Sequence, residues 1–235
     1  MRVEDVLESA FSEGGGLLSL YESLRLVEAY GLPVARYGLA KTEDDAVELA
    51  EKLGYPVVLK VSSPDVSHKT DVGGVILGLE DPSEVRAAFR KIVSSVRERA
   101  PGARLEGIVV QEMVKGGYEV IIGGLIDPQF GPIVMVGMGG VYAEVYKDVV
   151  FELAPLAEEE ALEAILRLKG SKILKGYRGR PPADLKALAL VLSKTSQLVY
   201  ELHGKVSELD LNPTFALPDR VVIADARIVL AQKEE

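Results

Sequence analysis

The chain contains no cysteine, and this absence excludes disulfide bonds, thiolate metal sites and cysteine nucleophiles together. A chain without disulfides also fits a reducing compartment. Positive charge is scarce as well: 27 lysine and arginine residues stand against 36 acidic ones, which gives a net charge of −9. Long-range attraction to nucleic acid or to an anionic membrane is therefore not expected.

Long uninterrupted hydrophobic runs are missing too. The most apolar stretch, residues 120–146, is broken by several glycines and by four further residues, Asp127, Pro128, Gln129 and Pro132. No membrane-spanning helix is therefore expected there. The first residues, MRVEDVLESAF, carry acids where a signal peptide needs a basic start and an apolar run. These observations predict a cytoplasmic protein.

What the chain does contain is enough apolar material for a globular fold. With 48% hydrophobic and 27% charged residues over 235 positions, it can form one large domain or two modest lobes. Helical and strand patterns alternate at first, whereas short apolar runs from GIVVQEMV to VVFELA follow each other at hairpin spacing. We expect an α/β (α+β) protein with an N-terminal segment over residues 1–16, a first lobe over 17–106 and a second lobe over 107–235.

Several elements have clear end signals. Thr42 followed by Asp45 is a capping-box pattern, and it predicts a helix that ends at Gly54. Asp81 followed by Pro82 predicts the start of another helix. The segment PPADLKALALVLSKTSQLVYEL is expected to form the longest helix, and two strands, KVSELDLNP and RVVIADARI, close the chain.

His68, one of only two histidines, lies in a polar loop within the stretch VVLKVSSPDVSHKTDVGGVILGL. Lys60 ends the apolar run before this loop, and a lysine there must reach solvent or meet an anion. Taken alone, it is more often a lysine that reaches solvent. A loop with a glycine pair, here Gly73 and Gly74, often binds phosphate through its backbone N–H groups. Such a loop does not need an imidazole, so His68 requires a separate explanation.

Two further segments carry candidate ligands for a nucleotide. The run QEMV places Gln111 and Glu112 at the end of a strand, where an adenine could find an apolar slot with polar groups at its edge. Glu119 could accept hydrogen bonds from ribose hydroxyls. Each of these residues alone is more often an ordinary surface residue.

Acidic residues in the last two strands indicate a metal site. Because side chains alternate along a strand, Asp210 and Asn212 of ELDLNP face the same side, and Asp225 comes from the neighbouring strand. Hard divalent cations such as Mg²⁺ prefer oxygen ligands. The alternative is a salt bridge to a basic residue such as Arg227, and the pattern favours metal ligation.

Three other features leave their roles open. The turn over Gly137–Gly140 lacks the Gly-x-Gly-x-x-Gly spacing of a dinucleotide site, which favours a tight turn or a contact with another subunit. The loop with Lys175, Arg178 and Arg180 is either a solvated turn or an anion clamp. His203 lies in the last turn of a helix, where it interacts favourably with the helix dipole and needs no further function.

Together these motifs resemble the ATP-grasp β subunit of ADP-forming acetyl-CoA synthetase (acetate–CoA ligase), of the superfamily that includes succinyl-CoA synthetase. The resemblance rests on the histidine stretch, on GYEVIIGGLIDPQFGPIVMVGMGGVYAEVYKDVVFELAPL, on LKGYRGRPPAD and on ELDLNP, and it covers the chain from about Leu17. It implies a two-lobed ATP-grasp fold with nucleotide and Mg²⁺ between the lobes. It also implies the reaction acetyl-CoA + ADP + Pi ⇌ acetate + CoA + ATP, with CoA bound by a separate α subunit in an α2β2 heterotetramer.

The resemblance also implies residue roles. His68, in a mobile loop over residues 62–74, would carry a phosphoryl group from a histidine of the α subunit to ADP, and neutral imidazole is a good carrier near pH 7. In succinyl-CoA synthetase a glutamate stands where this chain has Asp210, so the shorter side chain would need an intervening water. The implied nucleotide-binding residues are Lys60, Lys69, Gly73, Gly74, Gln111, Glu112, Met113, Val114 and Glu119, and the implied metal ligands are Asp210, Asn212 and Asp225.

Other functions remain compatible with the sequence. A stand-alone ATP-grasp carboxylate ligase would let an amine attack an acyl phosphate, and His68 would then be incidental. A non-catalytic nucleotide-binding regulatory module and a part of a protein acyltransferase-like assembly are further alternatives.

Overall fold

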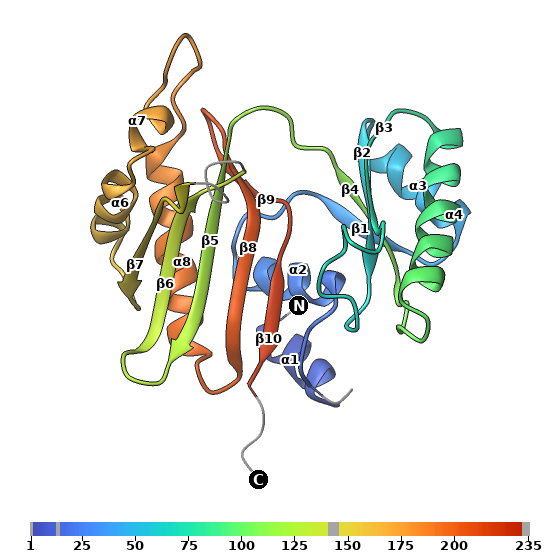
Figure 1. Cartoon of the computed structure of the whole chain (residues 1–235), viewed down its shortest axis with the longest axis horizontal. Coiled ribbons are helices and arrows are strands. Elements are labelled where there is room, and N and C mark those ends of the chain that lie inside the picture. The colour runs from blue at the N-terminus through green and yellow to red at the C-terminus, as the bar shows by residue number, and fades with distance from the viewer. Residues whose placement is uncertain (1, 13–14, 141–145, 232–235) are drawn as a thin grey trace. The chain divides into compact units, whose positions relative to one another are not determined.

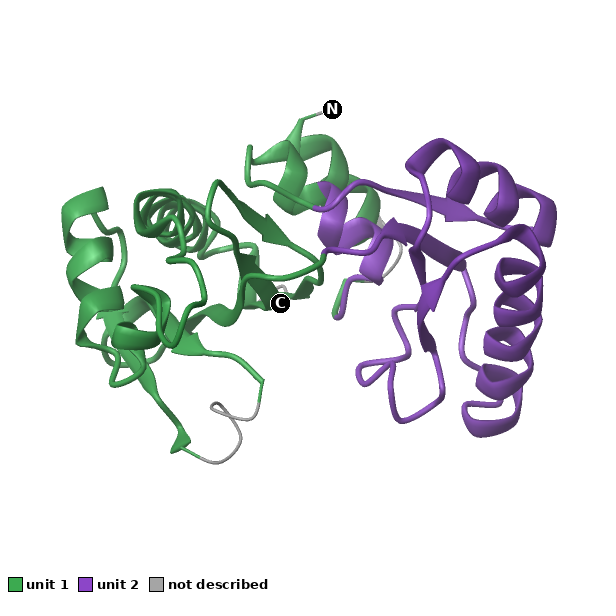
Figure 2. Cartoon of the chain, turned by 90° about the horizontal axis from the view of Figure 1, so that it is seen from above, with its two compact units in different colours: residues 1–16, 26–34, 115–235 green, residues 17–25, 35–114 purple. Residues whose placement is uncertain are grey.

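The structure, a computed structural model, describes residues 2–12, 15–140 and 146–231 (Figure 1). Its internal contacts divide the chain into two compact units, shown in different colours in Figure 2. Unit 1 comprises Met1–Gly16, Leu26–Val34 and Lys115–Glu235, and unit 2 comprises Leu17–Arg25 and Ala35–Val114.

Unit 2 is built on a four-stranded antiparallel sheet with the strand order β1–β4–β2–β3. Helices α3 and α4 cover one face of this sheet, because alternate apolar residues of β2 and β4 share a buried core with both helices. The elements are β1 (Tyr37–Ala40), α3 (Glu43–Leu53), β2 (Val57–Ser62), β3 (Val75–Leu79), α4 (Pro82–Arg99) and β4 (Gly107–Glu112). A further helix, α2 (Leu20–Ala29), begins in unit 2 and ends in unit 1.

Unit 1 contains a six-stranded antiparallel sheet with the order β10–β8–β5–β6–β7, and β9 pairs with β8 as well. Helix α8 packs closely on one face: a Cβ added to Gly124 would lie 2.4 Å from Val199 Cγ2. The strands are β5 (Tyr118–Asp127), β6 (Gly131–Met138), β7 (Val149–Leu153), β8 (Val206–Ala216), β9 (Val221–Ile223) and β10 (Arg227–Leu230). The helices are α1 (Val3–Ser12), α6 (Glu158–Arg167), α7 (Ser171–Leu174) and α8 (Leu185–Glu201).

The helix ends predicted from local signals are confirmed. Thr42 and Asp45 form both hydrogen bonds of a capping box, and Gly54 is the C-cap of α3. Backbone N–H groups, first that of Lys41, donate to the Asp45 carboxylate and hold its pKa below the usual range. Asp81 caps α4 by accepting from two backbone N–H groups of its first turn.

The expected lobe boundary at residues 106/107 differs from the observed one. Strand β4 pairs with β1 and β2, so it completes the sheet of unit 2, and the division falls between Val114 and Lys115. Hairpin spacing could not reveal this, because the partners of β4 lie far back in the chain. Residues 1–16 belong to unit 1, and the final run RVVIADARI is divided into β9 and β10. The strand expected in VYAEVY falls almost entirely outside the described residues.

Within the described part of the chain, no helix has both the length and the apolar character that a membrane span requires.

Candidate functional site

The connection between β2 and β3, residues 63–74, carries His68 with an exposed side chain. Two backbone hydrogen bonds close this loop at its base: Val61 N donates to Gly74 O (2.8 Å), and Gly74 N donates to Lys69 O (2.7 Å). The histidine therefore lies on a folded turn that is joined directly to two paired strands.

Further contacts tie the histidine loop to unit 2. The backbone N–H of Asp71 donates to His68 O (3.2 Å), and Arg99 Nη1 of α4 donates to Asp71 O (3.1 Å). At the other end of the loop, the Asp65 carboxylate accepts from the backbone N–H of Arg104 at 2.7 Å. The loop is thus held at both sides, whereas the imidazole itself points to solvent.

The glycine pair of this loop meets two different requirements. Gly73 has φ +66°, a left-handed conformation that other residues adopt only at a cost. Gly74 has an ordinary φ but no room: an added Cβ would lie 2.4 Å from Val61 Cγ1 and 2.8 Å from Lys69 O. The backbone can therefore turn and pack here only without side chains.

Lys60 and Gln111 lie on the same face of the unit 2 sheet, opposite to α3 and α4. The register pairs Lys60 with Val109 and Val58 with Gln111, which makes the two polar residues diagonal neighbours on adjacent strands. Both are buried, with exposures of 6% for Lys60 and 1% for Gln111. Among the described residues, Gln111 Nε2 has no hydrogen-bond partner. A buried amide N–H without an acceptor is costly, and a bound ligand could supply one.

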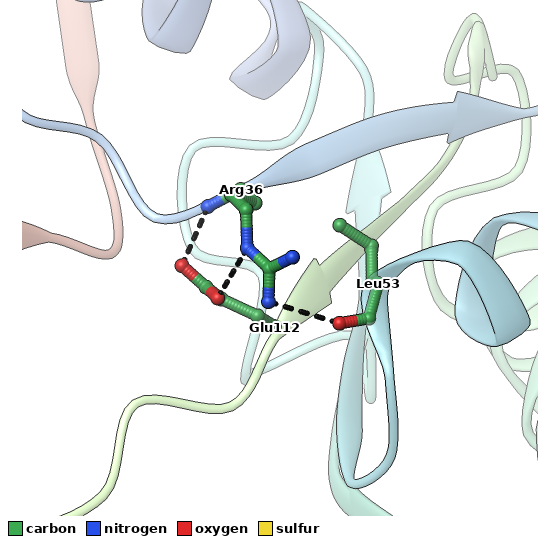
Figure 3. Close-up of polar contacts among 3 residues, drawn as sticks. All are labelled: Arg36, Leu53 and Glu112. Carbon is green, nitrogen blue, oxygen red and sulfur yellow. Dashed lines mark hydrogen bonds and ion pairs between the residues drawn. The ribbon is translucent and has the colours of Figure 1, made fainter.

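The carboxylate of the next residue, Glu112, is engaged by the protein itself, as Figure 3 shows. Its Oε1 accepts from the backbone N–H of Arg36 (2.9 Å), and its Oε2 accepts from Arg36 Nε (2.7 Å). The backbone N–H of Met113 is engaged as well, since it donates to Pro56 O (3.2 Å). Met113 and Val114 are the last residues of unit 2.

In unit 1, the sheet face opposite to α8 contains a hollow of about 350 Å³. Asp210 and Asn212 both line it, which confirms the expected alternation of their side chains along β8. Glu208 and Arg227 lie in the same hollow, and Arg227 Nη1 pairs with Glu208 Oε2 at 3.0 Å. The remaining lining is apolar and comes from Ile121, Leu125, Ile133, Val134, Met135, Phe151 and Leu209, with two glycines, Gly123 and Gly124.

Asp225 lies in the short connection between β9 and β10. Because Arg227 pairs with Asp210 and Ile223 with Thr214, residues 224–226 run alongside residues 211–213. This register places Asp225, which is 9% exposed, beside Asn212.

The donors that these strands provide fit a hard cation. No group of three His, Cys, Asp or Glu side chains in a metal-binding arrangement occurs in the part of the chain that the structure describes. A cation here would therefore rely on two carboxylates, the amide oxygen of Asn212 and oxygens of a bound phosphate. This is the mixed ligand set that Mg²⁺ commonly takes.

The glycine turn packs against Glu119. Gly139 N donates to Glu119 O (2.8 Å), and a Cβ added to Gly139 would lie 2.8 Å from the Glu119 carbonyl carbon. Gly140 has φ +60°, and a Cβ there would lie 3.3 Å from Glu119 Oε2. These glycines therefore allow a close approach to the residue predicted to meet the ribose.

Arg178 and Arg180 of the basic loop, and the second histidine, His203, have partners within unit 1. Arg180 Nη2 donates to Gly117 O (2.8 Å), and the guanidinium lies 4.6 Å from the centre of the Tyr118 ring. Arg180 thus ties its loop to the start of β5. Arg178 has φ 51° and lies over the ring of Tyr177. His203 Nδ1 lies 2.6 Å from Tyr200 O at the end of α8, which fits the expected helix-end position.

Arg36 is the residue that sequence reasoning missed. Arg36 precedes β1. It contacts Glu112 only because β1 pairs with β4, with Tyr37 opposite Gln111. The two residues are 76 positions apart, and no local motif links them.

The model of the ATP-grasp domain family matches residues 9–230 of this chain. The acetate–CoA ligase [ADP-forming] I subunit beta of Pyrococcus furiosus is 40% identical over 97% of this chain and 98% of that protein. The acetate–CoA ligase [ADP-forming] I of Archaeoglobus fulgidus is 47% identical over 99% of this chain, but only 33% of that longer protein is covered.

Solved structures agree with this match. Acetyl-coenzyme A synthetase 1 of Ca. Korarchaeum cryptofilum, in complex with coenzyme A, Ca-AMPCP and HgCl⁺, has a TM-score of 0.93 at 43% identity, over 97% of this chain and 99% of that one. The same enzyme with coenzyme A and Mg-AMPPCP has its phosphohistidine segment pointing towards the nucleotide binding site; its TM-score is 0.84 at 39% identity, over 97% and 100% of the two chains. The predicted ATP-grasp fold and family resemblance are therefore confirmed.

Proposed function

This chain belongs to the ATP-grasp domain family, and we propose that it is the nucleotide-binding β subunit of an ADP-forming acetate–CoA ligase. The net reaction is acetyl-CoA + ADP + Pi ⇌ acetate + CoA + ATP. The observation that carries the proposal is the exposed His68 on its folded loop, in a chain that matches β subunits of this ligase from end to end.

In this proposal His68 is the phosphoryl carrier. A ring nitrogen accepts the phosphoryl group from a donor on the partner subunit, and the bond to that donor breaks. The nitrogen–phosphorus bond then breaks as the terminal phosphate oxygen of ADP takes the group, which completes ATP. A substantial fraction of imidazole is neutral and nucleophilic near pH 7, and phosphoryl transfer depends mainly on positioning and charge neutralisation.

Most of the residues proposed to position the nucleotide belong to unit 2. Lys60 and Lys69 supply positive charge for phosphate oxygens, and the glycine pair gives the loop a backbone without side chains. Gln111 offers an amide donor that has no acceptor in the part of the chain that the structure describes, on the same sheet face as Lys60. The proposed nucleotide-binding residues are Lys60, Lys69, Gly73, Gly74, Gln111, Met113, Val114 and Glu119. Glu112, which was also expected among them, is left out because Arg36 engages both oxygens of its carboxylate.

Mg²⁺ fits the oxygen donors of the unit 1 sheet, and Asp210, Asn212 and Asp225 would hold it. When bound, this ion neutralises charge on the phosphates. The residues themselves place two carboxylates and an amide oxygen on neighbouring segments.

The proposed partner is a CoA-binding α subunit. This chain covers 98% and 96% of two β subunits from P. furiosus, and it spans 33% of the ligase of A. fulgidus. The partner is supported by the relatives of P. furiosus, which are named as beta subunits. We propose an α2β2 assembly in which the α subunit carries CoA and the acyl group.

The decisive test labels the chain with γ-³²P-ATP and Mg²⁺. We expect label that is stable to base and labile to acid, as a phosphohistidine is, on the wild type and on His203→Ala but not on His68→Ala. The chain has only two histidines, so His203→Ala is a matched control. A wild type that takes up no such label, or a labelled His68→Ala variant, would overturn the proposal. It would instead favour a carboxylate ligase or a regulatory module.

A further inference from the structure

Glu112 and Arg36 form a closed ring of hydrogen bonds at the end of β4. The side chain of Glu112 accepts from the backbone and the guanidinium of Arg36, while the backbone N–H of Glu112 donates to Arg36 O (2.9 Å). The two residues are therefore joined in both directions, and Figure 3 shows the two bonds that the Glu112 carboxylate accepts from Arg36. Each contact fixes the place where the chain leaves the sheet of unit 2.

The same guanidinium reaches a third element. Arg36 Nη2 donates to the carbonyl of Leu53 at 2.9 Å, and Leu53 is the last residue of α3. Carbonyls at a helix C-terminus lack partners within the helix, and a cation there is favourable. Arg36 thus links the end of β4 to the end of α3 and the start of β1.

The ring of hydrogen bonds lies on one side of the unit 2 sheet, and the face that carries Lys60 and Gln111 is on the other side. Adjacent residues of a strand point to opposite faces, so Glu112 points towards α3 while Gln111 points to the face that carries Lys60. Gln111 Nε2 is buried on that face without a partner among the described residues. The two neighbours therefore have different tasks: one is held by the protein, and the other is available to a ligand.

We propose that Arg36 and Glu112 are positioning residues that aim Gln111, Met113 and Val114 at the base of the nucleotide. This inference rests on the proposed function, because it takes the 111–114 segment as the part that meets the base. Arg36 and Glu112 themselves do not touch the nucleotide in this account.

A role in stability alone fits the geometry less well. The side chain of Arg36 is 63% exposed and that of Glu112 is 28% exposed, and ion pairs at such positions contribute little to folding. The pair does hold the last residue of β4, and only Met113 and Val114 follow it before unit 2 ends. Loss of the ring should therefore weaken nucleotide binding more than folding.

The experiment compares binding of Mg-ADP and of Mg-pyrophosphate to the wild type and to Arg36→Ala, Glu112→Ala and the milder Glu112→Gln. We expect the Kd for Mg-ADP to rise about tenfold in both alanine variants and less in Glu112→Gln, with little change in melting temperature. The Kd for Mg-pyrophosphate, which has no base, should stay within about twofold. The variant that combines Arg36→Ala and Glu112→Ala should bind Mg-ADP about as well as either single variant, because each single change already breaks the same ring of hydrogen bonds.

Arg86→Ala is the matched control, since it removes an ion pair with Asp44 (2.6 Å) between α4 and α3 of the same unit. If the ring variants bind Mg-ADP as Arg86→Ala does, or lose both ligands equally, the positioning role is wrong and the proposed function stands. If the wild type binds neither ligand, the proposed function fails first and the inference falls with it.

Discussion

A methyl group at position 74 should test whether the histidine loop depends on close backbone packing. The Cβ of Gly74→Ala would lie 2.4 Å from Val61 Cγ1 and 2.8 Å from Lys69 O. The first contact is with a β-branched side chain of a buried strand, and the second is with backbone, so neither neighbour can move freely. The hydrogen bonds that join Gly74 to Val61 and Lys69 must lengthen, and His68 must shift with them.

Overpacking of this kind costs about 1–3 kcal/mol. For a chain of this size each kcal/mol lowers the melting temperature by about 2–4 °C, so a cost in the middle of this range, about 2 kcal/mol, should make Gly74→Ala melt about 4–8 °C below the wild type. Gly73→Ala has a different cause, because its φ of +66° costs an alanine about 1–2 kcal/mol even where space is available.

The measurement pairs thermal melts with the rate of phosphoryl label uptake by His68. Gly204→Ala is the control, because a Cβ there has no described atom within 4 Å and the residue is exposed. We expect the control to match the wild type in both measurements, and Gly74→Ala to lose most of its labelling rate at a temperature where it is still folded. A Gly74→Ala protein that melts and labels like Gly204→Ala would show that the close packing around Gly74 does not matter.

The remaining predictions concern the carrier, the metal ligands and the partner. His68→Ala or His68→Asn should keep the affinity for Mg-ADP within about threefold but abolish turnover in the reconstituted enzyme; full turnover would exclude His68 as the carrier. Asp210→Asn and Asp225→Asn should each weaken Mg-ADP binding, measured by the shift in melting temperature that Mg-ADP causes. The melting temperature of the ligand-free protein should change little. A large loss of stability without ligand, together with unchanged Mg-ADP affinity, would instead favour a structural ion pair. The purified chain alone should form no ATP from acetyl-CoA, ADP, Mg²⁺ and phosphate until a CoA-binding partner is added.

Local signals predicted the fold where one short segment contains the whole cause. The capping box of Thr42 and Asp45 needs four consecutive residues, and it starts α3 as expected. The pattern of Asp81 and Pro82 starts α4 for the same reason. Strand β4 was assigned to the wrong group of strands, because its pairing with β1 and β2 depends on residues that lie far apart in the sequence.

The metal-site residues show how far alternation alone can lead. Asp210 and Asn212 line one hollow because they are two positions apart in a regular strand. Asp225 was expected within a strand, and the structure places it in the connection between β9 and β10. It still lies beside Asn212. The pairs Ile223–Thr214 and Arg227–Asp210 enclose three residues on each segment, and Asp225 and Asn212 are the middle ones. Its place therefore depends on register, which the sequence does not state.

The QEMV segment shows why a short motif does not have one function. Gln111 and Glu112 were grouped as nucleotide ligands because both stand at the end of a strand, yet adjacent strand residues must point to opposite faces. Only one of them can face Lys60, and the register selects Gln111. Glu112 then needs a partner on the other face. Arg36, just before the neighbouring strand β1, is that partner. In a segment that binds the base, Gln111 then faces the ligand. Its neighbour Glu112 faces the other side of the sheet, where its contact with Arg36 holds the end of β4 in place.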